Sequence, residues 1–309
     1  HYADLKEIGC RRVAVRNFPS KILNLLAFFL LTNSRSIGYI FTFTLVGVVM
    51  GSLIQLLKTD RAKIYATVTG LGNVFLYPFI GPTISKIVYR MALWNAHYVF
   101  VQNQSDEQVI KKLCRASSKI VRVGGSGVDI HKFGQKPMPK SLKTKFLIAS
   151  RFIDNKGLKE LFTATINLTV DYSDKFELHI AGDFDLSKAS KKLRKLVNKC
   201  TNLKQVSFIG RVNDMPSKIA EYDAVVLPSY REGLSKFLLE AASVGRPLLA
   251  SDVPGCRELV EHGVNGYIFK SKDVHDLQKY MEKFINLGSP SKEAMGQESR
   301  SLIEKKYSE

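Results

Sequence analysis

The run Glu232–Glu240 (EGLSKFLLE) holds the residues with the clearest potential for chemistry. It follows an apolar stretch, ending at Pro228, that is predicted to be a strand, and it opens a predicted helix, with Gly233 and Ser235 at the turn. The first N–H groups of a helix lack intrahelical acceptors and lie at the positive end of its dipole. The run therefore predicts a site that suits an anion such as phosphate, with the Glu232 carboxylate beside it.

The same spacing allows a purely structural interpretation of these charges. Glu232 would then be a carboxylate that the helix dipole favours at the start of the helix. Lys236 and Glu240 would form an exposed i, i+4 ion pair. Spacing alone leaves the two interpretations equally open.

Three other patterns are weaker candidates. Asp183-Phe184-Asp185 has the form of a metal-binding pair, but two carboxylates alone do not make a cation cage, so a loop is favoured. The run Gly124–Gly127 lacks the Gly-Lys-Ser/Thr of a Walker loop, and a turn leading to Asp129 is expected. The histidines are scattered and none is assigned as a base: His97, His131, His179 and His262.

The elements that would position these residues alternate between short apolar strands and amphipathic helices, which predicts a parallel sheet covered on both faces. In the second half we expect strands at Phe146–Ser150, Phe176–Ala181, Val206–Ile209, Ala224–Leu227, Pro247–Ala250 and Gly266–Phe269. We expect helices there at Gly157–Val170, Lys188–Cys200, Met215–Glu221, Ser235–Ser243, Gly255–Glu261 and Val274–Asn286.

The first half is less regular but fits a second α/β domain. We expect strands at Arg12–Val15, Tyr39–Phe43, Ile64–Thr67 and Tyr98–Val101, and helices at Phe79–Trp94 and Asp106–Cys114. The Pro-containing stretch Phe133–Leu142 is the predicted linker, so we divide the chain into domains at 1–140 and 141–288, with 289–309 packing back across them. Two such domains place a ligand cleft between the carboxyl ends of two sheets.

One stretch is long and apolar enough to raise the question of a membrane span. Ile37–Leu57 has no charged residue, and Ile22–Leu31 nearby is also very apolar. A buried strand that runs into a buried helix is the favoured interpretation, because Thr42 and Thr44 alternate with Phe41 and Phe43 at its start.

The net charge of the chain indicates which kinds of partner it could bind. The chain of 309 residues has a net charge of +18, and residues 1–140 alone carry 19 basic and 6 acidic side chains. The first half should therefore attract a phosphate-rich ligand, nucleic acid or an anionic membrane. No basic run is interleaved with aromatic residues, so no nucleic-acid partner is expected.

The four cysteines are far apart in the sequence: Cys10, Cys114, Cys200 and Cys256. Their spacing argues against a disulfide framework and against a structural zinc site, and it suits a reducing compartment.

Several motifs together resemble the retaining glycosyltransferases of family 4, which have the GT-B fold. The resemblance rests on the Glu-x7-Glu run above, on Arg151 and Lys156 in SRFIDNKG, on Phe208–Arg211 and on Gly245–Phe269. Motifs of the first half are similar to a narrower group, the bacterial enzymes that extend undecaprenyl-diphosphate-linked glycans of capsule, O-antigen or protein glycosylation: Thr42–Thr44, Val68–Phe75, Val101–Glu107 and Gly125–Asp129.

The resemblance implies a role for each matching residue. Arg151 and Lys156 would bind the donor diphosphate and offset its growing charge as the glycosidic bond breaks, and Glu232 would accept hydrogen bonds from the sugar. Glu240 would accept both ribose hydroxyls, which one carboxylate can do. The remaining contacts to the sugar nucleotide would come from the main chain of the turns at Gly233, Leu234 and Ser235 and at Gly210 and Arg211.

Two departures from the family pattern are visible. The resemblance implies that the N-terminal domain lacks its first strand, because Leu5–Val15 matches the end of the first helix and the second strand. The apolar Leu45–Val49 stands where relatives usually have a Lys and polar residues.

We therefore expect two Rossmann-like domains that face a cleft. The expected reaction moves a hexose or N-acetylhexosamine from a nucleotide sugar to a polyprenyl-diphosphate-linked saccharide. The expected donor is UDP-linked, and the anomeric configuration of the sugar should be retained. No cofactor or metal is expected. The resemblance implies a peripheral position on the cytoplasmic face of the cell membrane. Two alternatives are a UDP-sugar 2-epimerase, against which the Glu-x7-Glu run argues, and a degenerate, non-catalytic binding subunit.

Overall fold

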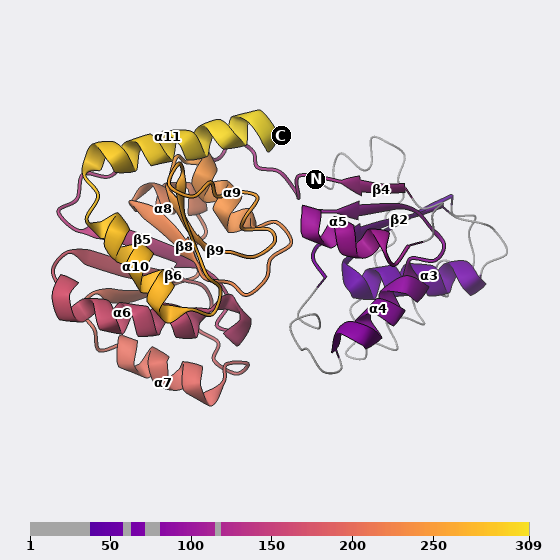
Figure 1. Cartoon of the computed structure of the whole chain (residues 1–309), viewed down its shortest axis with the longest axis horizontal. Helices are drawn as coiled ribbons and strands as arrows, with labels where there is room; N and C mark the ends of the chain where they lie inside the picture. Colours follow the sequence, from indigo (N-terminus) through magenta and orange to yellow (C-terminus); the bar gives the residue numbers. More distant parts are fainter. Residues whose placement is uncertain (1–37, 58–62, 72–80, 115–118, 309) are drawn as a thin grey trace.

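The computed structural model describes residues 38–57, 63–71, 81–114 and 119–308, which form two α/β domains (Figure 1). The N-terminal domain has a parallel sheet in the order β1-β2-β3-β4. Its strands are β1 (Tyr39–Phe43), β2 (Lys63–Val68), β3 (Ala96–Val101) and β4 (Lys119–Arg122). Its helices are α3 (Thr44–Leu57), α4 (Gly81–Ala92) and α5 (Gln104–Lys111).

The apolar stretch after residue 37 forms the expected strand, β1, followed directly by helix α3. The strand is buried on one face only, because Tyr39, Phe41 and Phe43 are 60%, 63% and 61% exposed. The two elements pack face to face: Gly51 of α3 lies against Thr42 of β1, where a Cβ would come too close to the threonine methyl group. Thr42 and Val48 are buried at this contact. No helix among the described residues is both long enough and apolar enough to cross a membrane. Ile22–Leu31 lies outside the described residues.

The C-terminal domain has a six-stranded parallel sheet in the order β10-β9-β8-β5-β6-β7. Its strands are β5 (Thr144–Ala149), β6 (Phe176–Ala181), β7 (Val206–Gly210), β8 (Ala224–Leu227), β9 (Leu248–Ser251) and β10 (Gly266–Phe269). Its helices are the 3-10 turn η2 (Asp154–Lys156), α6 (Leu158–Tyr172), α7 (Lys191–Cys200), α8 (Met215–Ala220), α9 (Lys236–Ser243), α10 (Val274–Ile285) and α11 (Ser289–Lys306).

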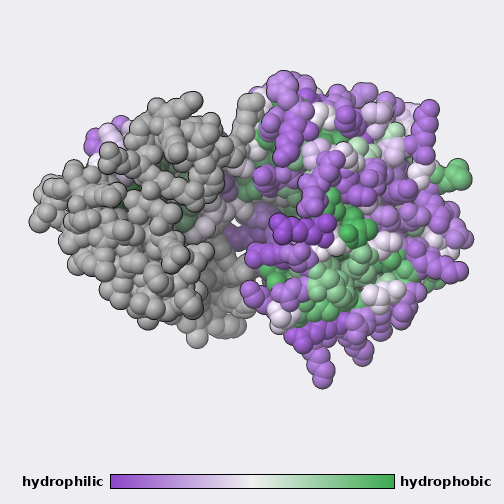
Figure 2. Space-filling model, turned by 180° about the vertical axis from the view of Figure 1, so that it is seen from behind, coloured by the Kyte–Doolittle hydropathy of each residue, from purple (hydrophilic) through white to green (hydrophobic). Residues whose placement is uncertain are grey.

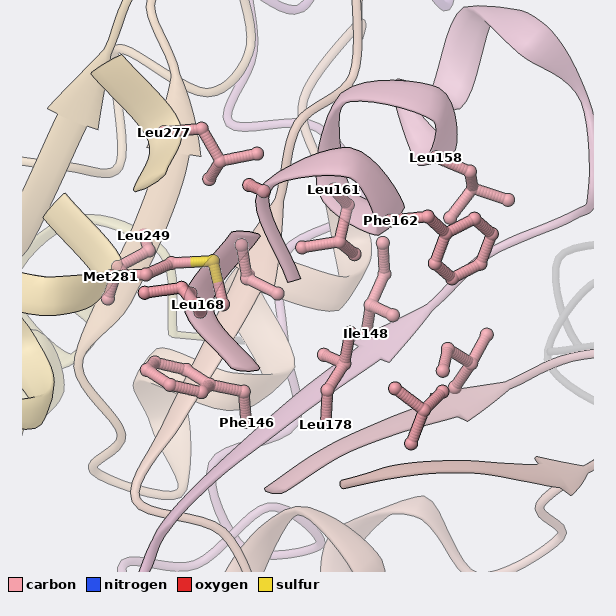
Figure 3. Packing of buried hydrophobic residues seen from close by; sticks show 14 of the residues in the cluster. Phe146, Ile148, Leu158, Leu161, Phe162, Leu168, Leu178, Leu249, Leu277 and Met281 are labelled. Atoms are coloured by element: carbon pink, nitrogen blue, oxygen red, sulfur yellow. The ribbon is translucent and has the colours of Figure 1, made fainter. Parts of the chain in front are cut away.

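The sheet is buried on both faces, as the apolar strands predict. On one face Phe146 and Ile148 of β5 pack against Leu161 and Phe162 of α6, and Met281 of α10 closes the same cluster (Figure 3). A second cluster on the opposite face joins the sheet to α9 and to the end of α11. Seen from behind, hydrophilic side chains cover most of the rim of this domain, and hydrophobic ones gather nearer its middle (Figure 2).

One predicted helix and one strand differ between the sequence-based expectation and the structure. Gly255–Glu261 was predicted to be a helix, and this is wrong: the segment forms successive turns, with Gly255 at φ +80 and Cys256 N–H bonded to Val253 O. Strand β4 was not predicted, because it is short and mostly exposed and so lacks an apolar alternation. The predicted strand Arg12–Val15 and the segment Leu5–Val15 lie outside the described residues.

The beginning of the predicted linker packs into the C-terminal domain. Phe133 is buried in the cluster beneath α9. The guanidinium of Arg246, which is itself fully buried, donates to the carbonyls of Lys136 and Pro137 at 3.1 and 2.7 Å. Arg300 of α11 donates to Phe133 O at 3.1 Å. Two arginines therefore tie residues 133–137 to the C-terminal domain.

Candidate active site

The turn between β8 and α9 carries the candidate anion site. Ser235 caps α9, since its hydroxyl accepts from Leu238 N–H at 3.3 Å. The turn is hydrogen-bonded to the segment that follows β9: Glu232 N–H donates to Pro254 O, and Ser235 N–H donates to Gly255 O. The Ser235 N–H thus already has an acceptor within the protein, so in this arrangement Ser235 holds the turn in place.

Lys156 reaches this turn from the neighbouring strand β5, through η2. Gly157, which ends η2 with φ +68, lies so close to Pro228 at the end of β8 that a Cβ would collide with the proline carbonyl. Asn155 O accepts from Tyr230 N–H at 2.9 Å. These two contacts hold η2 against the segment that leads into Glu232.

The consequence is a contact between Lys156 and Glu232. Lys156 Nζ lies 2.5 Å from Glu232 Oε1, and the two side chains are 18% and 16% exposed. Each charge is therefore partly desolvated and satisfied by the other. A cation that binds phosphate and a carboxylate that accepts from sugar hydroxyls are thereby adjacent, at the carboxyl ends of two neighbouring parallel strands.

Asp154 fixes the far side of η2. Its carboxylate accepts from the backbone N–H and the hydroxyl of Ser190, the N-cap of α7, at 2.9 and 2.6 Å. It also pairs with Lys159 at 3.0 Å. Although burial opposes ionisation, these hydrogen bonds lower the pKa of Asp154 overall. The turn that carries Lys156 is thus held by contacts of Asp154, Asn155 and Gly157.

Arg151 and the turn at Gly210 stand at the ends of strands on the other side of Lys156. Arg151 is exposed and lies two residues beyond the end of β5. Gly182 N–H, after β6, donates to Gly210 O at 2.8 Å, and the Gly182 backbone lies against Ser150 O. A Cβ on Gly210 would meet no atom within 4 Å, so the space beside Gly210 and the exposed Arg211 is open.

Glu240 lies on the same helix as Ser235, in the interior of α9. Lys236 Nζ is 3.8 Å from Glu240 Oε1, so the pair that the structural interpretation expects is present. Lys236 is 71% exposed, but Glu240 is only 13% exposed. Burial raises the pKa of Glu240, against the lowering effect of Lys236 and Lys132. Glu240 is therefore a partly desolvated carboxylate, not half of an exposed surface pair.

Cys256 is buried in the hydrophobic cluster near Glu232. Burial, with a smaller contribution from Glu232, raises the pKa of the thiol well above its ordinary value. Cys256 is therefore an uncharged packing group. The three described cysteines are all free thiols.

The N-terminal domain contacts the β8–α9 turn through residues of Val68–Phe75 and Val101–Glu107, stretches to which the sequence analysis gave no individual roles. Asn103 Nδ2 donates to Gly233 O at 2.8 Å. A Cβ on Gly233 would collide with Thr69 O and with the Gln102 side chain. Only glycine fits between the two domains at this position, so the glycine of the turn serves close approach of the N-terminal domain.

An ion pair between Arg231 and Asp106 crosses the same interface. Asp106 is fully buried and also accepts from Asn103 Nδ2 at 3.0 Å. Asn103 is the N-cap of α5, and its side-chain oxygen accepts from Asp106 N–H. Burial, with Asp106 adding to it, raises the pKa of the nearby Tyr89 to about 12. Two signals were available: Val101–Glu107 is one of the stretches that resemble the narrower group, and Asn followed three residues later by Asp is a helix-start pattern.

The Asp183-Phe184-Asp185 motif forms a loop after β6. Asp185 Oδ1 accepts from Ser187 N–H at 2.8 Å, which makes it a turn residue. Within the ranges that the structure describes, no cluster of three or more His, Cys, Asp or Glu side chains includes it. His179 contacts Tyr222 and lies away from the site.

The chain is similar in sequence to bacterial glycosyltransferases. The N,N'-diacetylbacillosaminyl-diphospho-undecaprenol alpha-1,3-N-acetylgalactosaminyltransferase of Campylobacter jejuni is 26% identical over 243 residues, which are 72% of this chain and 62% of that protein. The capsular polysaccharide biosynthesis glycosyltransferase CapM of Staphylococcus aureus is 26% identical over 69% of this chain and 55% of its own length. The chain thus spans about three fifths of the length of these relatives.

Solved structures share the architecture. HepE of Anabaena, determined in complex with UDP-glucose, aligns over 99% of this chain and 85% of its own, with a TM-score of 0.78 and 17% identity. Sucrose-phosphate synthase of Thermosynechococcus elongatus aligns over 93% of this chain and 74% of its own, with a TM-score of 0.77 and 18% identity. These likenesses confirm the expected GT-B fold.

The family model described as glycosyl transferases group 1 matches residues 130–302, more than half of the chain. Its matched range contains both partners of the Lys156–Glu232 pair and the whole of α9. The chain therefore belongs to the glycosyl transferases of group 1.

Proposed function

We propose that this chain is a retaining glycosyltransferase that moves a hexose or N-acetylhexosamine from a nucleotide sugar, UDP-linked, to a lipid-linked saccharide of a bacterial surface polysaccharide or glycan. The observation that carries the proposal is the contact between Lys156 and Glu232 at the carboxyl ends of β5 and β8. In a family of sugar transferases, this position suits the diphosphate and the sugar of a donor.

The sequence relatives support the choice of acceptor. The name of the Campylobacter jejuni relative describes transfer of N-acetylgalactosamine to a sugar carried on diphospho-undecaprenol. The relative from Staphylococcus aureus belongs to capsular polysaccharide synthesis. Both names describe glycan assembly in bacteria, and the first describes a polyprenyl-diphosphate acceptor. The UDP and UDP-glucose complexes of HepE support a UDP-linked donor.

The residues divide the work between binding and bond cleavage. Lys156 and Arg151 would meet the negative charge that grows on the diphosphate as the glycosidic bond breaks. Glu232 would accept from sugar hydroxyls and Glu240 from the ribose, while the main chain at Gly210, Arg211, Gly233 and Leu234 borders the nucleotide. The departing diphosphate would take the proton of the attacking hydroxyl, so this scheme needs no pair of carboxylates of the glycosidase kind.

The proposal also places the protein on the cytoplasmic face of the cell membrane, held reversibly by an anionic surface. The acceptor would be embedded there by its polyprenyl chain, and the net positive charge of residues 1–140 suits that surface.

The test is transfer of label from radioactive UDP-sugars to lipid extracted from bacterial membranes. We expect a labelled lipid-linked product with one donor, and an α linkage where the donor is α. Donor binding without turnover on any acceptor would indicate a non-catalytic subunit. Conversion of a UDP-N-acetylhexosamine to its 2-epimer without acceptor would indicate an epimerase.

A further inference from the structure

Helix α4 is apolar on two sides, although the core uses only one of them. Tyr89 and Leu93 point into the N-terminal core and are 1% and 0% exposed. Ile87 and Met91, one helical turn apart, are 54% and 69% exposed. A second apolar stripe that is more than half exposed is a feature that calls for a partner.

Neighbouring residues extend this stripe into a surface. Trp94, just beyond the end of α4, is 45% exposed, and Leu53 of the adjacent helix α3 is 42% exposed. A hollow of about 320 Å³ lies between the two helices and is lined by Ser52, Arg90, Met91, Trp94 and Asn95. We call the surface formed by Leu53, Ile87, Met91 and Trp94 the α3–α4 patch; α3 and α4 lie together on one side of their sheet (Figure 1).

The charges beside the α3–α4 patch have one sign. Lys86 and Arg90 are exposed and precede Ile87 and Met91 by one residue, so they form a basic stripe along the apolar one. Residues 44–57 and 81–95 contain no Asp or Glu. The surface therefore combines exposed apolar side chains with cations, without an acidic residue in either segment.

Helix α7 of the other domain provides an internal comparison. It is more basic than α4, with Lys191, Lys192, Arg194 and Lys195 all exposed. None of its large hydrophobic side chains is exposed. Helix α7 thus presents positive charge without exposed apolar side chains, whereas α4 presents both together.

We propose that the α3–α4 patch docks on the surface of an anionic lipid bilayer. Ile87, Met91 and Trp94 would enter the boundary between head groups and acyl chains, and Lys86 and Arg90 would contact the lipid phosphates. An indole is well suited to this boundary because it has an apolar body and one polar N–H. The inference rests on the proposed lipid-linked acceptor and assigns the surface that would bring the protein to it.

The chain supplies its own probe, because Trp94 is its single tryptophan. We expect Trp94 emission to shift to shorter wavelength on addition of phosphatidylcholine vesicles that contain phosphatidylglycerol, and to be quenched by brominated acyl chains. Pure phosphatidylcholine vesicles should produce little change. Unchanged emission in protein that sediments with the anionic vesicles would overturn the proposal.

Paired variants separate the apolar and the charged contributions. Ile87→Ser with Met91→Ser, and Lys86→Gln with Arg90→Gln, should each weaken co-sedimentation with the anionic vesicles by about tenfold or more. Lys191→Gln with Lys195→Gln removes the same charge from α7 and is the matched control, with an expected effect of less than about threefold. An equal loss in the control and the α4 variants would mean that net charge alone binds the vesicles, and would overturn the assignment.

Further measurements distinguish this proposal from the proposed function and from a protein partner. The variants should keep the melting temperature of the parent protein and its transfer rate to a water-soluble acceptor with a short lipid. Normal transfer with unaltered vesicle binding in the α4 variants would overturn the docking surface only. Vesicle binding through the patch without transfer to any acceptor would overturn the proposed function only. A dimer that the α4 variants dissociate, with vesicle binding unaltered, would assign the patch to a second copy instead.

Discussion

Lys156 Nζ lies 2.5 Å from Glu232 Oε1, although 76 residues separate them in the sequence. The two side chains come from the ends of adjacent strands, and each is mostly shielded from water. Without a donor they neutralise one another. Under the proposed function, a bound diphosphate would draw the ammonium group toward itself and leave the carboxylate to accept from sugar hydroxyls, so the pair would be exchanged for substrate contacts.

The first prediction concerns these groups and Arg151. Glu232→Ala, Lys156→Ala and Arg151→Ala should each lower kcat/KM by about 10²- to 10³-fold, the loss that follows removal of one preorganised group that stabilises transition-state charge. Steady-state transfer rates measure this, and circular dichroism should show an intact fold. Lys218→Ala is the control, because it removes an exposed Lys–Glu pair outside the site. Near-normal kcat/KM in folded variants would show the assignment to be wrong.

The second prediction concerns the ion pair between Arg231 and Asp106. Loss of either partner leaves the other charge in a buried interface, which typically costs about 3–5 kcal/mol. Asp106→Asn and Arg231→Met should therefore weaken contact between the domains, increase the radius of gyration in X-ray scattering and lower kcat/KM. UDP affinity should change much less, because the expected nucleotide contacts lie in the C-terminal domain.

The double variant Asp106→Asn with Arg231→Met is the control for this pair. It removes both charges, so its loss should be smaller than the sum of the two single losses. Strictly additive losses, or an unaltered radius of gyration in all three variants, would count against a role of this pair in domain contact.

The local elements around the site were predictable from sequence, and the contacts between them were not. The β8–α9 turn follows from an apolar strand, a glycine and a serine cap, all of which are local signals. The pairing of Asp106 with Arg231 joins residues 125 positions apart in two domains, and nothing in the spacing of either residue indicates the other. The GT-B resemblance supplied the architecture without supplying this contact.

The wrongly predicted helix Gly255–Glu261 has an equally specific cause. The apolar and charged residues after Gly255 have a helical spacing, but Gly255 at φ +80 lies directly against Gly233, and the chain turns there instead. The linker Phe133–Leu142 was predicted from its prolines, its glycine and its few apolar side chains. Two of its carbonyls accept hydrogen bonds from Arg246, a residue more than a hundred positions later in the chain, and no local pattern indicates that contact.

The third prediction concerns Glu240. Because burial raises its pKa, the folded protein holds this proton more tightly than the unfolded chain does. The stabilising contribution of Glu240 is thus full below the ordinary carboxyl pKa and is lost as the pH rises through the raised value. Glu240→Gln should therefore increase the melting temperature at neutral pH but not in acid.

The same variant tests the ribose contact. UDP affinity, measured by calorimetry, should fall in Glu240→Gln by about tenfold, the equivalent of about 1.4 kcal/mol for one charge-assisted hydrogen bond. The affinity of the parent protein should increase with pH as Glu240 ionises, and that increase should disappear in the variant. An unchanged donor Kd would contradict the assignment.

The fourth prediction concerns Arg246. Its guanidinium donates to carbonyls of the linker and to Ala220 O, and it is fully buried. Burial lowers its pKa to about 10. Arg246→Ala should cost about 3–5 kcal/mol of unfolding free energy, because several carbonyls lose their donor at once. Arg257→Ala, at an exposed pair with Asp252, should cost about 1 kcal/mol or less in the same denaturant titration.

The last prediction is that transfer needs no divalent metal. Arg151, Lys156 and the first turn of α9 offer positive charge where the diphosphate is proposed to bind, so the donor charge has partners without an ion. Asp185 is already committed to a turn through Ser187 N–H. Transfer rates should therefore persist after EDTA treatment and in the Asp183→Ala and Asp185→Ala variants. Complete loss of transfer in EDTA, with recovery on addition of Mn²⁺ in the parent protein but not in these variants, would establish the Asp183-Phe184-Asp185 loop as a metal site.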